Sequence, residues 1–231
     1  MMKNIKSLNI TKIIFSFIEE RKLLTLIKHN KKAKNLMDIT LLNYKFLSGR
    51  YIVYNNDNNG NGKGKEYDGH TNKLIFEGEY LNKKRNGKGK EYNLYGELIF
   101  DGEYLKGKRN GKGKEYEDSK NNILIYEGEY LNGLKNGEGK EYDIEGNLEF
   151  EGEYLNDKRN GKGKEYGYNC KIIFDGEYIN NIKWNGKGYD IDGNISYELN
   201  EGKGYVKLYS FYGKLEFEGE YLNGLKNGKV K

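Results

Sequence analysis

The sequence has no proline and very little cysteine, histidine or apolar side chain. Its single cysteine, Cys170, excludes a disulfide framework and favours a reducing, intracellular setting. Its two histidines, His29 and His70, are isolated, so they form neither a metal-ligand set nor a base–nucleophile pair. Hydrophobic residues make up 35% of the 231 residues, too few for a thick globular core. The apolar stretch at residues 13–18 is too short to span a membrane.

Charged residues of both signs are abundant but nearly balanced. The chain has 40 Lys and Arg against 35 Asp and Glu, a net charge of +5. Proteins that bind nucleic acid usually carry a more one-sided charge, so no nucleic-acid partner is expected. Glycine is frequent, and 32 glycines without a proline fit many sharp turns and close backbone contacts.

A block of residues recurs along most of the chain. Its first half reads Phe-Glu-Gly-Glu-Tyr and its second half Asn-Gly-Lys-Gly-Lys-Glu-Tyr, with a basic segment between them. The glycine of Gly-Glu-Tyr stands at positions 78, 102, 128, 152 and 176, so the steps are 24, 26, 24 and 24 residues. A fixed period of this size indicates an array of stacked units, which presents an extended surface rather than one catalytic pocket.

Each unit is predicted to form a β-hairpin. Residues 74–81 alternate and are rich in β-branched and aromatic side chains, which favours a strand. Residues 82–86 are expected to form a loop, 87–92 a second strand and 93–97 the next turn. Neighbouring hairpins would join into a mainly β fold, an elongated single-layer antiparallel β-ribbon of about sixteen strands.

The favoured register within a hairpin pairs Tyr80 with Gly87, Glu79 with Lys88, Gly78 with Gly89, and Glu77 with Lys90. It sets opposite charges against each other, worth about 0.2–1 kcal/mol per pair. It also lets Phe76 and Tyr80 cover the glycines beside them. A shift of one residue would instead set Glu77 against Glu91.

The pattern divides the chain into two regions. Residues 47–231 are expected to hold about eight units, of which the first and seventh are degenerate and the last is truncated. Residues 1–46 contain no glycine, and apolar residues such as Ile10, Ile13, Ile14 and Phe17 recur at helical spacing. A small N-terminal α-helical segment that caps the first sheet edge is therefore predicted.

The repeated residues closely resemble a known family. Glu-Gly-Glu-Tyr-Leu-Asn-Gly, followed by Asn-Gly-x-Gly-Lys-Glu-Tyr, is similar to the membrane occupation and recognition nexus (MORN) repeat, and the resemblance extends over residues 47–231. It implies a single-layer, groove-shaped β-ribbon that serves as a structural or binding element. This chain departs from the family by using Lys-Glu-Tyr in the second strand, where the family is more apolar.

The N-terminal segment resembles, more weakly, the helix pair of an F-box. The resemblance rests on Ile13, Ile14, Phe15, Phe17, Leu23 and Leu24, while the usual Leu-Pro opening and the tryptophan of the third helix are absent. It implies docking of these side chains to the small adaptor subunit of cullin-type ubiquitin ligases. The alternative is that the helices serve only as a cap.

The predicted hairpin loops concentrate basic residues. They hold Lys83, Lys84, Arg85, Lys106, Lys108, Arg109, Lys158 and Arg159. The turns at the opposite ends of the hairpins hold mostly Asp and Glu, so the two long edges of the ribbon should differ in sign. A basic edge would attract anionic lipid headgroups at about 1 kcal/mol per residue, or an acidic partner. Alternatively, its lysines only keep an exposed edge soluble.

These observations favour a non-catalytic repeat scaffold that binds protein partners through the extended ribbon surface. One alternative is a peripheral membrane module that binds anionic phospholipids through the basic turns. Another is an F-box-type substrate adaptor of a ubiquitin ligase. Self-association through the C-terminal sheet edge is also expected, because the sequence ends just after the onset of a strand.

No enzymatic activity, cofactor or metal is expected. Paired carboxylates such as Glu77 and Glu79 recur in a ladder, whereas a glycosidase needs one pair in a cleft. The predicted location is cytoplasmic, at the inner face of a membrane if the lipid hypothesis holds.

Overall fold

The computed structural model describes residues 49–55, 60–118, 122–167, 170–210 and 214–227. All regular elements in these ranges are β-strands, which confirms the mainly β class. The predicted helices of residues 1–46, with their cap and F-box hypotheses, lie outside the described residues and stay predictions.

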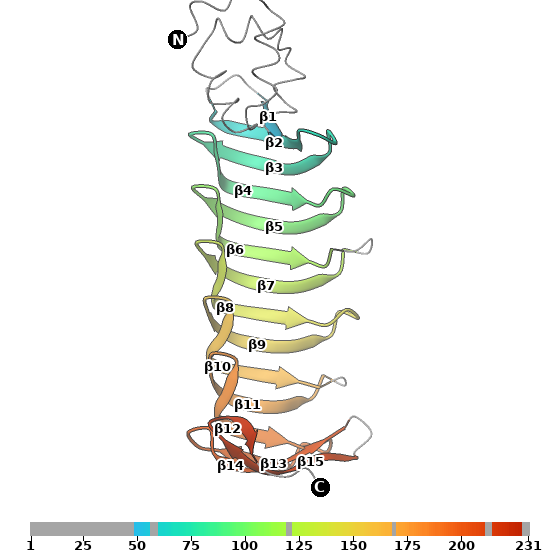
Figure 1. Ribbon diagram of the computed structural model, residues 1–231, viewed down its shortest axis with the longest axis vertical. Helices are drawn as coiled ribbons and strands as arrows, with labels where there is room; N and C mark the ends of the chain where they lie inside the picture. The colour runs from blue at the N-terminus through green and yellow to red at the C-terminus, as the bar shows by residue number, and fades with distance from the viewer. Residues whose placement is uncertain (1–48, 56–59, 119–121, 168–169, 211–213, 228–231) are drawn as a thin grey trace, which may run out of the picture.

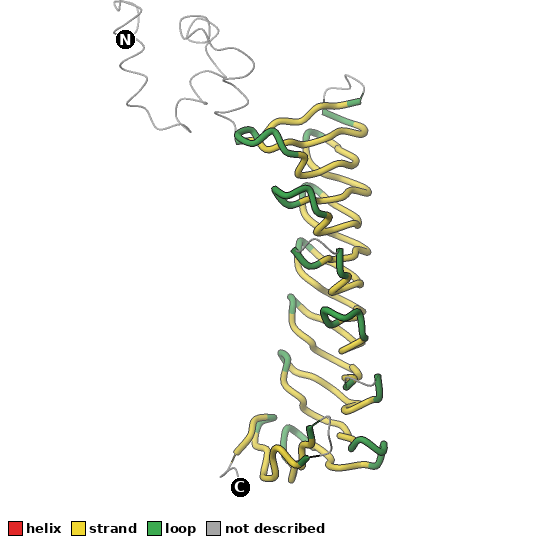
Figure 2. Tube along the Cα trace, turned by 90° about the vertical axis from the view of Figure 1, so that its right-hand side faces the viewer, coloured by secondary structure: helices red, strands yellow, loops and turns green. Residues whose placement is uncertain are grey.

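Sixteen strands follow one another along the described chain, and the first thirteen form one antiparallel sheet in sequence order (Figure 1). The side view shows the same elongated stack, with strands along its whole length (Figure 2). The single-layer ribbon of hairpins is therefore confirmed. The strands are β1 (Arg50–Tyr54), β2 (Gly62–Asp68), β3 (Leu74–Leu81), β4 (Lys84–Tyr92), β5 (Leu98–Leu105), β6 (Lys108–Tyr116), β7 (Leu124–Leu131), β8 (Leu134–Tyr142), β9 (Leu148–Leu155), β10 (Lys158–Tyr166), β11 (Ile172–Ile179), β12 (Ile182–Tyr189), β13 (Ile195–Leu199), β14 (Gly204–Tyr209), β15 (Leu215–Leu222) and β16 (Leu225–Asn227).

The connections between strands alternate between the two long edges of the ribbon. One edge carries short turns, such as Asn82-Lys83 between β3 and β4, and we call it the tip edge. The other carries longer turns, such as residues 93–97 between β4 and β5, and we call it the wide-turn edge. In Figure 1 the tip edge lies on the left and the wide-turn edge on the right.

The tip turn is shorter than the sequence predicted. The loop expected at residues 82–86 consists only of Asn82 and Lys83, and β4 begins at Lys84. Both turn residues have positive φ, at 52° and 61°, a conformation that asparagine tolerates better than most residues. Lys84 and Arg85 are therefore strand residues rather than loop residues.

The register within a hairpin follows only part of the favoured pairing. Two predicted pairs are present, Gly78 with Gly89 and Glu77 with Lys90. The other two are wrong, because Tyr80 lies opposite Arg85. Residues 86–88 form a bulge opposite Glu79, and Gly87 takes a φ of 83° there. Glycine adopts such a φ without strain, which permits the bulge.

Between neighbouring hairpins, for which no register was predicted, the same kinds of residue pair with each other. Strands β4 and β5 pair Gly87 with Tyr104, Lys88 with Glu103, Gly89 with Gly102, and Lys90 with Asp101. The equivalent pairs recur between β6 and β7 and between β10 and β11. Opposite charges thus face each other at these three boundaries between hairpins.

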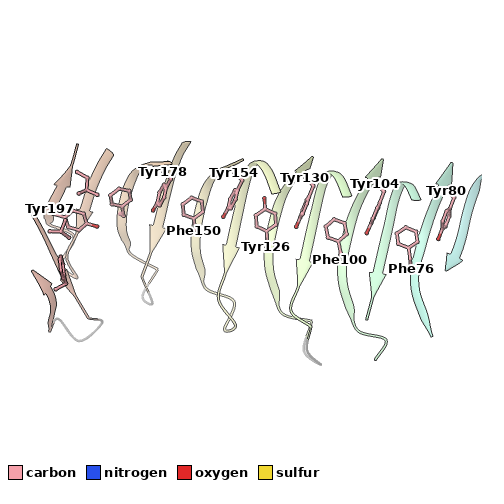
Figure 3. Packing of buried hydrophobic residues seen from close by; sticks show 14 residues of the cluster. Phe76, Tyr80, Phe100, Tyr104, Tyr126, Tyr130, Phe150, Tyr154, Tyr178 and Tyr197 are labelled. Carbon is pink, nitrogen blue, oxygen red and sulfur yellow. The ribbon is translucent and has the colours of Figure 1, made fainter. Parts of the chain in front are cut away.

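The core is a single column of aromatic rings on one face of the sheet (Figure 3). Phenylalanine and tyrosine rings pack edge-to-face from Tyr80 to Phe174, with ring centres 5.1–5.6 Å apart, and Tyr126 takes the place of a phenylalanine in the column. Phe100 is fully buried because it lies directly on a glycine: a Cβ at Gly113 would stand 2.4 Å from its Cζ. The prediction that rings cover the strand glycines is confirmed. We call this side of the sheet the ring face.

The sheet does not continue through the degenerate seventh unit. In β12, Trp184 is an extra residue, and Gly186 rather than Gly188 lies opposite Gly176. The following strand, β13, lacks the Gly-Glu-Tyr sequence, and the regular ladder ends there. Strands β14, β15 and β16 form a separate three-stranded sheet, so the expected continuous ribbon is interrupted at this point.

Candidate functional site

A continuous chain of ion pairs runs along the ring face. Glu91 of β4 binds two arginines, Arg85 of its own strand at 2.5 Å and Arg109 of β6 at 2.7 Å. Arg109 also lies 2.7 Å from Glu115, and the alternation continues in both directions. Within the described residues the series is Arg50, Glu66, Arg85, Glu91, Arg109, Glu115, Lys135, Glu141, Arg159, Glu165 and Lys183.

The cations of this chain also cover the aromatic rings. The guanidinium carbon of Arg109 lies 4.0 Å from the ring centre of Phe100, and that of Arg85 lies 4.2 Å from Phe76. Such contacts contribute about 0.5–2 kcal/mol, more when they are desolvated. Phenylalanine rings are thus fully buried in a one-layer sheet, with glycine below them and an ion pair above.

Three of the predicted anion-binding residues therefore lie in a different environment from the expected loop. Arg85, Arg109 and Arg159 are strand residues whose side chains are about one-fifth exposed, at 18%, 21% and 22%. Glutamates balance their charges at close range. An external anion would have to displace a glutamate to reach them.

The five predicted lysines keep exposed side chains at the tip edge. They are Lys83, Lys84, Lys106, Lys108 and Lys158, and none makes an ion pair within the described ranges. The first four occupy two consecutive tips, between β3 and β4 and between β5 and β6. Exposed leucines accompany them, Leu81 and Leu105. The structure thus separates the predicted basic set into paired arginines and exposed lysines.

A ladder of hydrogen bonds joins consecutive tips, and sequence reasoning missed it. The N–H of Gly107 donates to the carbonyl of Arg85 at 2.8 Å, and the same bond recurs at each tip up to Asn181. The side-chain oxygen of Asn110 also accepts the N–H of Asn132 at 3.2 Å. The asparagine of each Asn-Gly pair was the available signal, because asparagine side chains commonly bond to turn backbone.

The side of the sheet opposite the ring face carries a groove of about 950 Å³. We call it the groove face. Its walls are rows of lysines and acidic residues from β4 to β11. Ion pairs cross between neighbouring hairpins, for example Lys114 to Glu127 at 3.1 Å and Lys140 to Glu151 at 3.4 Å. Most of these side chains are a third to a half exposed, so the groove presents charge of both signs to solvent.

One position breaks the alternation of charge in the groove. Glu138 stands where the other units have lysine, and it lies opposite Glu153. Like charges that face each other directly destabilise a sheet slightly. The centre of the groove is therefore its most acidic part.

Tyrosines at the wide-turn side of the groove hold the outer glutamates. The hydroxyl of Tyr142 donates to Glu127 at 2.8 Å, and that of Tyr166 donates to Glu151 at 2.6 Å. The tyrosine hydrogen bond is the main reason that the pKa of Glu127 lies below its usual 4.5. Burial, and then the nearby Glu127, raises the pKa of Tyr142 to about 12.

Unfolding at acid pH tests these tyrosine–glutamate bonds. A carboxylate whose pKa is lowered by folding stabilises the protein above its unfolded pKa, and this stability is lost as the pH falls through the folded pKa. The free energy of unfolding should therefore decrease as the pH is lowered from about 4.5. The decrease should be less steep in the triple variant Tyr92→Phe, Tyr142→Phe, Tyr166→Phe than in the unmodified chain. Urea unfolding followed by circular dichroism at several pH values measures this. Tyr95→Phe, at an exposed turn, is the control, and equal pH slopes in the two variants would contradict the assignment.

Two further properties concern the described residues alone. They contain no group of three or more His, Cys, Asp or Glu side chains placed to hold a metal ion. Within the same ranges, no helix has the length and apolarity needed to cross a membrane.

Two solved structures show weak likenesses to the chain. A crystal structure of TarM is 14% identical, with a TM-score of 0.30 over 70% of this chain and 27% of that one. A mutant of TarM from S. aureus, in complex with fondaparinux, alpha-GlcNAc-glycerol and UDP, is 10% identical, with a TM-score of 0.17 over 87% of this chain and 27% of that one. Both scores are too low to bear on fold or function. No curated protein matches the chain.

The repeated hairpins themselves match a family model. The MORN repeat matches residues 76–92, 100–119, 126–147, 150–169 and 217–229. The first four segments each begin at the buried aromatic residue of β3, β5, β7 or β9 and extend at least to the end of the next strand. The resemblance inferred from the glycine and aromatic positions is confirmed in these five segments, each of which matches the MORN repeat.

Proposed function

We propose that this protein is a non-catalytic scaffold that binds a protein partner along its groove face. The observation that carries the proposal is the groove itself, whose charged walls extend over eight consecutive strands. A partner that lies along the ribbon would meet a repeated arrangement of lysine and acidic residues, interrupted only at Glu138 within the described groove. Electrostatic complementarity of this kind gives specificity and speeds association more than it adds affinity.

The ring face is a poorer binding surface. Its aromatic rings are buried, and its arginines and glutamates already satisfy one another. Groove-face charges such as Lys88, Lys112 and Lys162 are more exposed, so they are available to a partner. The ring face thus holds the ribbon together, and the groove face is left for recognition.

Affinity purification from the source cell with matched variants tests this proposal. Lys88→Glu, Lys112→Glu and Lys162→Glu together reverse three charges in the groove. We expect the bound partner to be reduced by roughly tenfold or more, because like charges brought together at an interface cost several kcal/mol.

The control variant reverses three exposed lysines on the wide-turn edge, Lys73, Lys171 and Lys214. It changes the net charge by the same amount and should retain the partner. Equal recovery with both variants, or no protein enriched over an unrelated bait, would rule out groove binding.

A second candidate function is docking to an anionic membrane. The observation that favours it is the group of four exposed lysines at two consecutive tips, flanked by Leu81 and Leu105. Lysines near an anionic surface contribute about 1 kcal/mol each, and exposed leucines add apolar contact. The charge-swap variants described below separate this function from binding between copies of the chain.

A further inference from the structure

The two long edges of the ribbon have opposite net charge. The described part of the tip edge contains six lysines and two acidic residues. The lysines are Lys83, Lys84, Lys106, Lys108, Lys158 and Lys203, and the acidic residues are Asp157 and Glu201. The described part of the wide-turn edge contains eight acidic residues and three lysines. The acidic residues are Asp68, Glu97, Glu117, Asp118, Asp143, Glu145, Asp190 and Asp192, and the lysines are Lys73, Lys171 and Lys214. The difference in sign expected from the sequence is therefore present, although both edges are mixed.

Both edges also expose apolar side chains. Leu81 and Leu105 stand beside the tip lysines. On the wide-turn edge Tyr95 is 84% exposed, in the same turn as Glu97, and Ile144 is 67% exposed, next to Glu145. Each edge thus combines charge with apolar contact area.

The tips along one edge and the wide turns along the other have the same spacing, because each hairpin contributes one of each. Consecutive tips are two strands apart, and so are consecutive wide turns, which gives about 10 Å in each case. A second copy of the same chain therefore has the matching repeat along the regular sheet formed by β1 to β13. The described turns are tied down by their own hydrogen bonds: Asp143, for example, accepts the N–H groups of Glu145 and Asn147 at 2.9 and 2.8 Å.

We propose that copies of this chain associate side by side, with the tip edge of one copy against the wide-turn edge of the next. One offset brings the largest opposite charges together. It places the tips with Lys83, Lys84, Lys106 and Lys108 against the consecutive wide turns with Glu117, Asp118, Asp143 and Glu145. The same offset places the tip with Lys158 against the turn with Asp190 and Asp192.

This contact is heterologous, because two different surfaces meet. Each added copy leaves a free edge of each kind, so the rows stay open rather than closing into a dimer. Contacts made only by turns bury little area, which makes each contact weak. Association should therefore grow with protein concentration and decrease with salt.

Light scattering and sedimentation of the full chain test this inference. At about 20 mM salt, where charges act over a long range, the weight-average mass should rise at least twofold above the monomer mass of 26.8 kDa as the concentration rises. At about 500 mM salt it should return to the monomer mass. A mass that does not change with concentration would overturn the inference.

Charge-swap variants give the sharper test. The tip variant carries Lys83→Glu, Lys84→Glu, Lys106→Glu and Lys108→Glu, so both of its edges are acidic. The wide-turn variant carries Glu117→Lys, Asp118→Lys, Glu145→Lys and Asp192→Lys, all in turns that this offset brings against lysine tips, so both of its edges are basic. Each variant alone should stay monomeric, and an equimolar mixture should regain the association of the unmodified chain.

The controls distinguish this contact from other modes of binding. The groove variant Lys88→Glu, Lys112→Glu, Lys162→Glu should still associate, even where it loses the partner proposed above. Association of either swap variant alone, or an equimolar mixture that stays monomeric although circular dichroism shows both variants folded, would contradict the inference. Binding to anionic vesicles is measured for the same variants. If the tip variant alone loses vesicle binding while its association is unaffected, the tip lysines bind a membrane surface and the inference is contradicted.

Discussion

Replacing Phe100 with alanine should lower the free energy of unfolding by about 3–5 kcal/mol, the usual range for a fully buried phenylalanine. The ring of Phe100 is completely buried, and it contacts Tyr104, Tyr130 and the guanidinium of Arg109. Removing it interrupts the aromatic column, which is the core that the described residues form in this part of the sheet. Urea unfolding followed by circular dichroism measures the change.

The control for this variant is Leu105→Ala in the same strand. Leu105 is 47% exposed at the tip edge, so its removal should change the free energy of unfolding by no more than about 0.5 kcal/mol. Similar losses in the two variants would mean that the aromatic column does not carry the stability of the ribbon.

Glu91→Gln should produce the second large effect, a loss of about 2 kcal/mol in the free energy of unfolding. Glu91 accepts from Arg85 and Arg109, whose side chains are only about one-fifth exposed. Breaking a fully buried ion pair typically costs about 3–5 kcal/mol. We expect less here, because Arg85 keeps Glu66, Arg109 keeps Glu115, and some solvent reaches both.

Asp101→Asn on the groove face is the matched comparison. Asp101 lies 3.5 Å from Lys90, and both side chains are more than 40% exposed. Exposed pairs of this kind contribute about 0–1 kcal/mol, and salt weakens them further. If Glu91→Gln is no more destabilising than Asp101→Asn, then the ion pairs of the ring face are not a structural element.

The strand pattern and the seating of rings on glycines could be predicted from the sequence because both depend on short-range periodicity. Strand β3 covers residues 74–81 as expected, and Phe76 lies on Gly89. The bulge at residues 86–88 could not be predicted in the same way. It depends on a positive φ at Gly87, and a glycine in a strand pattern fits either a regular ladder or a bulge.

The candidate site was predicted less completely than the fold. Sequence spacing placed Arg85 in the same loop as Lys83 and Lys84, and all three have the same charge. The tip turn has only two residues, so Arg85 instead lies in the strand beside Glu91, where it covers Phe76. The short tip turn decides that Arg85 is paired with glutamates while Lys83 and Lys84 are exposed. Amino-acid composition does not reveal the length of this turn.

The identical contacts between neighbouring hairpins have a consequence for the evolution of the ribbon's length. Each hairpin of the regular part touches only the one before and the one after it, through the same glycine pairs, ring contacts and tip hydrogen bonds. Duplication or loss of one whole unit would therefore recreate a boundary that already exists, and would change the length by about 10 Å without altering any cross-section. The distance spanned by such a protein is set by how many copies its gene contains, independently of what its surface recognises.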